Sequence, residues 1–147
     1  MNDGPTEEHR EDLDPLLDYL LPFAVQMIEK HGEFYPFGAI VRQDGQIASV
    51  GAVPDSEQPD THQVLDLLQT AIHEGFVSGI RAAAICMDVR VQLGSDAITD
   101  AIRVWMQHSA GEPLDVFMPY EKRRLRSPRF GDLQAVPADA PLFPADP

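Results

Sequence analysis

The stretch from Ile80 to Tyr120 constrains the fold most, because three runs of alternating apolar and polar residues follow one another with only short turns between them. In the first run, the alternate positions hold Ile85, Met87, Val89, Val91 and Leu93. Successive side chains of a strand point to opposite faces, so this alternation predicts strands with one buried and one solvated face. Two further runs, Ile102 to Met106 and Leu114 to Tyr120, complete a predicted three-stranded antiparallel meander with little room for catalytic loops.

The residues before this stretch predict two helices with a β-hairpin between them. Apolar residues recur at helical spacing from Asp12 to His31, and Pro22 is expected to kink this helix or divide it in two. The dipeptide Asp44-Gly45 predicts a tight hairpin, because such a turn requires positive backbone angles. A second helix is expected after Asp60 or Thr61, either of which can cap it. The predicted fold is α+β, with helix, hairpin, helix and meander in that order and both helices packed on a single, mostly antiparallel sheet.

Composition divides the chain into three parts. We expect residues 1–11 to fray, residues 12–121 to form a single domain, and residues 122–147 to form a tail that is first basic and then rich in proline. A domain of this length can bury a core without disulfides or a structural metal. From Ser127 onward the tail is expected to be disordered or draped over the body, although its Leu142-Phe143 pair could instead dock on the body or on a partner.

The net charge of −13 is unevenly distributed along the 147 residues. Residues 1–121 carry a net charge of −15, whereas residues 122–129 carry +5. A strongly acidic body repels nucleic-acid phosphates and suits a basic protein partner, while plain solubility is the simpler explanation. We therefore expect no nucleic-acid partner. The basic segment is expected to contact the acidic body of the same or a neighbouring chain, in a contact that salt weakens.

Cellular location is predicted from what the sequence contains. Cys86 is the only cysteine, so no intrachain disulfide can form and nothing indicates an oxidising compartment. Residues 1–14 are acidic and polar, unlike a secretory signal, and no apolar run is long enough to span a bilayer. The sequence is interpreted as that of a cytoplasmic protein with no membrane partner.

Candidate chemistry is sparse. Cys86 lies in the middle of a predicted strand, where a thiol usually behaves as a small buried apolar group, and it could act as a nucleophile only with a base in reach. The five histidines are scattered, and His62 and His73 are about three helical turns apart, too far to bind one ion. We predict no catalytic residue, no cofactor and no metal ligand. A small enzyme built around Cys86 or a histidine, with acids from other strands, is an alternative.

The polar face of the meander is the first candidate interface. If the predicted hairpin pairs as expected, its adjacent strands bring together Asp88, Arg90, Arg103, Trp105 and Gln107. Arginine and tryptophan are the residue types that anchor protein contacts. The simpler interpretation is a solvated sheet face with cross-strand ion pairs, and a pocket for a small anion or ligand ranks third. Which charges meet depends on the strand register, which the sequence leaves open.

An aromatic cluster before the first predicted strand is the second candidate interface. It consists of Phe34, Tyr35 and Phe37. Such a cluster most often closes the end of a core. Exposed at the surface, it would instead form an apolar patch of the kind that marks a partner site.

The order helix, hairpin, helix and meander resembles the roadblock and profilin-like group of α+β folds, and the segment from Gly38 to Ser49 resembles the first hairpin of roadblock-type domains. The likeness covers roughly residues 12–120. It implies a dimer without enzymatic activity that scaffolds or regulates small GTPases. The chain departs from that family in its proline-containing first helix and in its proline-rich end, where a last helix is expected. Residues 82–120 also resemble small bacterial proteins of unassigned function, which implies no activity.

These features together predict a cytoplasmic, non-enzymatic protein-interaction or regulatory module that acts as a homodimer or through a protein partner. Small size and acidity also suit an immunity-like or antitoxin-like protein that neutralises a basic toxin. This neutraliser is the second functional alternative.

Overall fold

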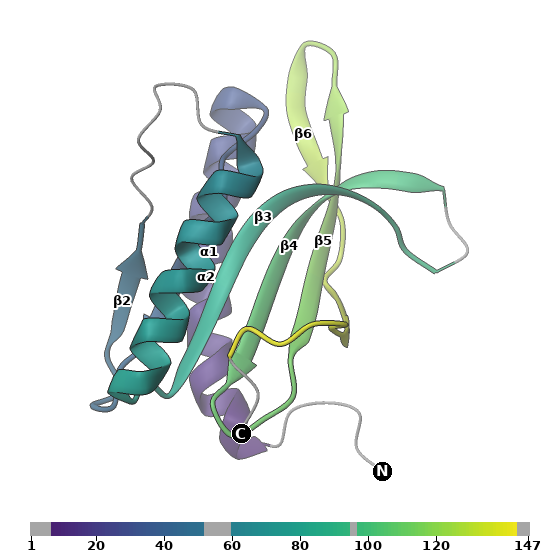
Figure 1. Cartoon of the computed structure of the whole chain (residues 1–147). Coiled ribbons are helices and arrows are strands. Elements are labelled where there is room, and N and C mark those ends of the chain that lie inside the picture. The colour runs from purple at the N-terminus through teal and green to yellow at the C-terminus, as the bar shows by residue number, and fades with distance from the viewer. Residues whose placement is uncertain (1–6, 52–59, 95–96, 144–147) are drawn as a thin grey trace.

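The computed structural model describes residues 7–51, 60–94 and 97–143 (Figure 1). In these ranges the chain forms two helices and one antiparallel sheet of seven strands, which confirms the α+β prediction. The expected helix, hairpin, helix and three strands are present, and two further strands follow them. In chain order the elements are α1 (Glu7–His31), β1 (Phe37–Val41), β2 (Ile47–Val50), α2 (Thr61–Ser78), β3 (Ala82–Gln92), β4 (Ile98–His108), β5 (Leu114–Arg123), β6 (Arg126–Phe130) and β7 (Gln134–Pro137).

The strand order in the sheet is β2-β1-β3-β4-β5-β6, with β7 also paired to β5. Strands β3 and β4 form the longest ladder, which runs from Ala82 opposite His108 to Gln92 opposite Ile98. One edge of β5 pairs with β4, and its other edge is divided between two partners. Strand β7 pairs with the first half of β5, and β6 pairs with the second half.

Pro22 was expected to kink α1 or divide it in two, and the helix is continuous through this proline, so the division is ruled out. Its buried face consists of residues at three- and four-residue spacing: Leu13, Leu16, Leu20, Ala24 and Ile28. Pro22 and the residue one turn before it, Asp18, are both exposed. Water can therefore bind the carbonyl that proline leaves without a partner, while packing on both sides of Pro22 holds the helix together.

Both faces of the central strands are covered, which corrects the expectation of one solvated face. Helix α1 packs on the face that carries Cys86 and Val104, and α2 packs on the face that carries Ile85 and Trp105. The first six residues of β3 are all buried, and polar residues reach its surface only from Asp88 onward. In Figure 1 the two helices accordingly lie on opposite sides of the sheet.

The segment expected to be a tail contributes strands and core residues. The boundary predicted at residue 121 falls inside β5, and residues 126–130 and 134–137 form β6 and β7. Leu142 and Phe143 are buried beside α2, as the docking alternative proposed. Pro128 and Pro137 are tolerated because an edge strand does not need every N–H for its ladder. At the other end α1 already begins at Glu7, and residues 1–6, where fraying was expected, lie outside the described residues.

Neither described helix is long and apolar enough to cross a membrane.

Candidate interaction surfaces

The register of β3 and β4 separates the residues of the first predicted interface. Asp88 lies opposite Ile102, and Met87 lies opposite Arg103. Because directly opposed residues of an antiparallel pair point to the same face, Asp88 and Arg90 face the α1 side of the sheet. The other three members, Arg103, Trp105 and Gln107, face the α2 side. The predicted single patch was therefore wrong.

The α2-side members of this group hold a segment of the same chain. The indole Nε1 of Trp105 donates a hydrogen bond of 2.9 Å to the carbonyl oxygen of Ala140. The amide oxygen of Gln107 accepts hydrogen bonds from the backbone N–H groups of Leu142 and Phe143, at 2.7 and 3.3 Å. These residues therefore do form an interface, but its partner is the chain's own segment of residues 138–143, which crosses the sheet in Figure 1.

Arg103 is fixed in place beside this segment. Its Nε donates a hydrogen bond of 2.8 Å to the buried carboxylate of Asp115, and its guanidinium lies 5.2 Å from the ring centroid of Trp105. An arginine paired in this way orients the indole and compensates the charge of Asp115. The structure thus accounts for both arginine and tryptophan at these positions without an external ligand.

Asp88, on the α1 side, is paired with Tyr120. The tyrosine hydroxyl donates a hydrogen bond of 2.5 Å to the Asp88 carboxylate. Burial raises the pKa of Asp88, although this hydrogen bond and the nearby Lys122 act in the opposite direction. Burial and the hydrogen bond to Asp88 raise the pKa of Tyr120 as well, so its hydroxyl remains a donor. Arg90 lies further out and pairs with Asp100 at 3.3 Å.

The Cys86 thiol is fully buried on the α1 side of the sheet. Burial raises its pKa, and the charge of Asp88 raises it further. The thiol therefore stays protonated near neutral pH and has no access to a substrate. These two properties argue against the alternative in which Cys86 acts as a nucleophile.

A partly buried polar cluster around Asp12, which the sequence did not predict, joins α1 to the ends of β3 and β4. Arg81 donates two hydrogen bonds to the carboxylate of Asp12, at 2.8 and 3.3 Å. His108 accepts the Ala110 N–H at Nδ1, so its Nε2 carries the proton and donates to Asp12 at 2.9 Å. The ring of His9 stacks on that of His108 at 4.2 Å. Both ring nitrogens of His108 are thus engaged, and the cluster is structural.

In the part of the chain that the structure describes, no three histidine, cysteine or acidic side chains lie close enough together to hold a metal ion.

The aromatic cluster is divided between the core and the surface. Phe34 and Phe37 pack against the α1 side of the core with their ring centroids 5.4 Å apart, and Phe23 meets Phe37 edge to face at 5.1 Å. Tyr35 is 54% exposed. Phe34 and Phe37 therefore close the core, as the simpler interpretation proposed, and Tyr35 remains at the surface.

Tyr35 forms part of the wall of an open cavity of about 620 Å³, which we call the acidic cavity. It lies where the end of α1, the start of α2 and the middle of β3 meet. Three carboxylates and several apolar side chains line it: Met27, His31, Glu33, Phe34, Tyr35, Asp60, Thr61 and Asp88. Asp60 also caps α2 by accepting the Gln63 N–H at 2.8 Å, so the helix start fixes this carboxylate in place.

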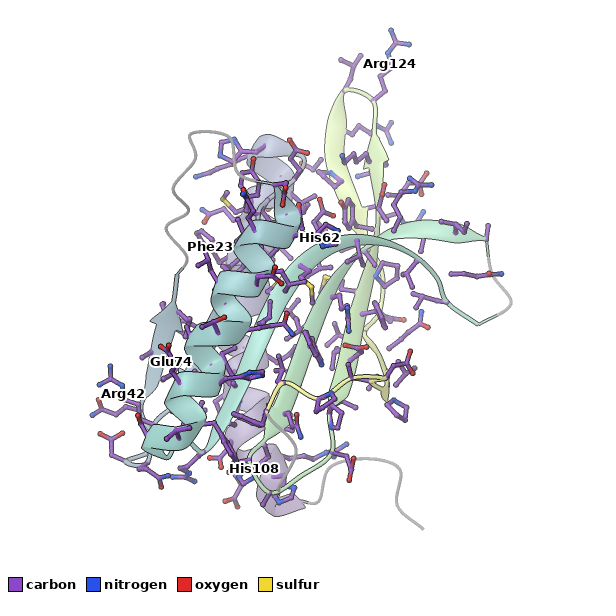
Figure 2. All side chains as sticks on the ribbon, in the orientation of Figure 1. Phe23, Arg42, His62, Glu74, His108 and Arg124 are labelled. Atoms are coloured by element: carbon purple, nitrogen blue, oxygen red, sulfur yellow. The ribbon has the colours of Figure 1, made fainter. Side chains whose placement is uncertain are left out.

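The hairpin of β5 and β6 projects from the body in Figure 1, and we call its residues 121–130 the basic arm. It carries five cationic side chains: Lys122, Arg123, Arg124, Arg126 and Arg129. None of these five takes part in an ion pair with another described residue. At the turn Leu125 is 97% exposed and adopts a φ of 61°, in the left-handed region that favours glycine. Figure 2 shows Arg124 at the far end of the arm, pointing away from the helices.

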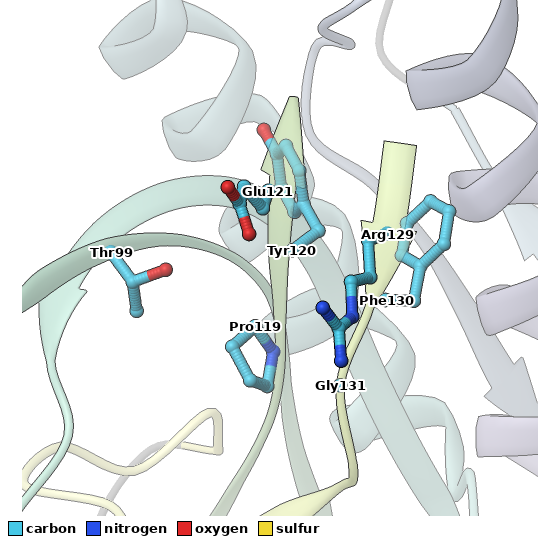
Figure 3. A pocket seen from close by; sticks show the side chains of 7 residues that line it. All are labelled: Thr99, Pro119, Tyr120, Glu121, Arg129, Phe130 and Gly131. Atoms are coloured by element: carbon cyan, nitrogen blue, oxygen red, sulfur yellow. The ribbon is translucent and has the colours of Figure 1, made fainter. Parts of the chain in front are cut away.

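A small hollow lies at the base of the basic arm (Figure 3). Its volume is about 210 Å³, and it is lined by Thr99, Pro119, Tyr120, Glu121, Arg129, Phe130 and Gly131. Glu121 and Arg129 lie opposite each other in the β5–β6 ladder, so the hollow carries one acidic and one basic side chain from the same face of the sheet. Ligand pockets usually exceed about 300 Å³, so this hollow is small for a ligand site.

Comparisons of the chain with protein-family models, curated proteins and solved structures give no match. The roadblock resemblance therefore stays a prediction, and function is argued from the surfaces described above.

Proposed function

We propose that the protein is a non-enzymatic protein-interaction module of the cytoplasm, and that it binds an acidic protein surface through the basic arm. The observation that carries the proposal is Leu125, which is 97% exposed at the tip of a projecting hairpin. A leucine in this position adds nothing to the core. Its left-handed backbone costs about 1–2 kcal/mol, and strain of this kind is concentrated at functional sites.

The chemistry of the arm suits an acidic protein surface. Arginine side chains bind carboxylates through two parallel hydrogen bonds, and Arg124 and Arg126 flank the exposed leucine. An apolar side chain surrounded by arginines can form the centre of a contact whose charges steer the approach of the partner. The body carries −15, which opposes binding to nucleic-acid phosphates and therefore favours an acidic protein as the target of the arm.

The proposal is tested by capturing partners with the tagged full-length chain in a lysate of the cells that produce it, at moderate salt. Arg124→Glu/Arg126→Glu should lose the captured acidic proteins, which include any untagged copies of the chain itself. The control variant Arg10→Glu/Arg42→Glu makes the same charge change at two exposed positions of the body and should retain them. Equal capture by wild type and arm variant would contradict a role for the arm.

A further inference from the structure

We propose that the basic arm binds a second copy of this chain, and that each arm of a two-fold symmetric dimer lies in the acidic cavity of the other copy. This inference rests on the function proposed for the arm and names its partner. It also gives the acidic body a basic partner, as its charge leads us to expect.

The acidic cavity matches the tip of the arm in chemistry. Carboxylates of Glu33, Asp60 and Asp88 line it, and arginine side chains on both sides of the tip can bind them. Apolar groups of Met27 and Phe34 line the same cavity and offer a contact for a leucine. At about 620 Å³ it lies within the size range of sites that bury a ligand or an anchoring side chain.

The positions of arm and cavity fit a closed dimer. In a two-fold dimer the same pair of surfaces meets twice, so both surfaces must lie on the side of the molecule that faces the other copy. Lys122, at the base of the arm, lies beside the end of α1: its Nζ is 3.7 Å from where a Cβ on Gly32 would be. Gly32 lies between His31 and Glu33, two residues that line the cavity. Arm and cavity are therefore adjacent.

The tip of the arm, unlike Lys122 at its base, points away from the cavity of its own copy. The ladder of β5 and β6 continues as far as the pair Arg123 and Arg126. The turn that follows this pair therefore lies at the end of the hairpin that projects from the body (Figure 1). In Figure 2 the Arg124 side chain points away from the helices that form the cavity. The charges and the exposed leucine at the tip are thus available only to another molecule.

The test exchanges charges between the two surfaces. The arm variant is Arg124→Glu/Arg126→Glu. The cavity variant is Glu29→Lys/Glu33→Lys, which alters the cavity residue Glu33 and Glu29 in the last turns of α1, both exposed. The arm variant places acidic side chains against the acidic cavity, and the cavity variant places two lysines near the arginines of the arm. Each variant alone should therefore sediment as a monomer near physiological ionic strength, where wild type sediments as a dimer. An equimolar mixture restores opposite charges at both contacts and should form a heterodimer.

The variant Leu125→Asn supplies a second measurement. It changes no charge, and asparagine tolerates the left-handed conformation at this position. It should raise the dimer dissociation constant roughly tenfold, because an apolar anchor is lost. A monomeric wild type would overturn the dimer, and so would variants that dimerise like wild type or a mixture that stays monomeric. If wild type is monomeric but the arm variant still loses its captured acidic proteins, the dimer fails and the function proposed for the arm stands.

Discussion

Among single residues, Leu125 is the one that we expect to lower the stability of the folded monomer while it favours association with another molecule. Its φ of 61° is the only positive value at a non-glycine position among the described residues. The side chain lies almost entirely in solvent, so the folded monomer gains nothing from its size. A residue that strains the monomer and exposes an apolar group is explained best by a contact outside the monomer.

Leu125→Gly should therefore change stability and association in opposite directions. Glycine removes the left-handed strain but adds conformational freedom to the unfolded chain, so we expect a net gain of about 0.5–1 kcal/mol in the free energy of unfolding. The same change should weaken the dimer. Urea unfolding of dilute protein and sedimentation of concentrated protein measure the two effects separately. A glycine variant that is less stable, or that dimerises like wild type, would contradict this interpretation.

Asp88 is the residue whose protonation should make stability depend on pH. Burial raises its pKa above the ordinary value of 3.8 in the folded state. Between the ordinary pKa and the raised one, the folded state binds more protons than the unfolded state, so the free energy of unfolding falls as pH rises. Asp88→Asn keeps an acceptor for the Tyr120 hydroxyl but cannot ionise.

The asparagine variant should thus lose less stability than wild type as pH rises from about 4 through the raised pKa of Asp88. Urea unfolding across this range tests the prediction, with Asp66→Asn as a matched control at an exposed position of α2. Identical profiles of unfolding free energy against pH for wild type and Asp88→Asn would show that this carboxylate does not control the pH dependence of stability.

At the scale of elements, the sequence predicted those whose signals are local. The Asp44-Gly45 turn is present with Gly45 at a φ of 87°, and α2 begins at the capping residue Asp60. The hairpin of β5 and β6 was missed because its turn residues, Arg124 and Leu125, have no preference for tight turns. The arm that we regard as the functional surface was therefore seen only as a basic cluster.

The remaining errors come from contacts between distant parts of the chain. The register that separates Asp88 from Trp105 is set by packing against two helices, which the alternation of β3 does not reveal. The cluster of Asp12, Arg81 and His108 joins three elements and leaves no local pattern. Proline content suggested a tail that is disordered or draped over the body from Ser127 onward, and its composition did not reveal that Gln107 and Trp105 supply the hydrogen bonds that hold residues 140–143.

The docked segment of residues 138–143 should behave as one element held by two kinds of contact. Phe143→Ala removes a buried aromatic ring and should lower the free energy of unfolding by about 3 kcal/mol. Gln107→Leu leaves two buried backbone N–H groups without their acceptor and should cost about 1–3 kcal/mol. Because either change releases the same segment, the double variant should lose less than the sum of the two. Urea unfolding measures the stability of the two single variants and the double variant, with Asp139→Ala as a control at an exposed position of the segment. Strictly additive losses would show that the segment does not dock as a unit.

At the scale of the whole molecule, a charge of −13 sets a condition for self-association. Two copies repel each other over long distances, whereas arm and cavity attract only at contact. Salt screens the long-range repulsion between the two copies before it screens the attraction at contact, because the Debye length falls from about 30 Å at 0.01 M to about 3 Å at 1 M ionic strength.

Dimer formation should therefore be strongest at intermediate ionic strength and weaker at both extremes. Sedimentation of wild type over a series of salt concentrations gives this profile. A dimer that strengthens steadily with salt would indicate an apolar contact in place of the charged one proposed here.

The division of the outer edge of β5 between β6 and β7 has a consequence for polymerisation. A long, regular edge strand is a template on which further chains can add as strands, and this is a common start of fibrils. Here that side of the sheet ends in two short strands: a proline interrupts β6, another ends β7, and β6 also carries like-charged arginines. Further chains would find no continuous row of backbone donors there. The flank of the molecule that holds the basic arm is thereby protected against amyloid-like growth.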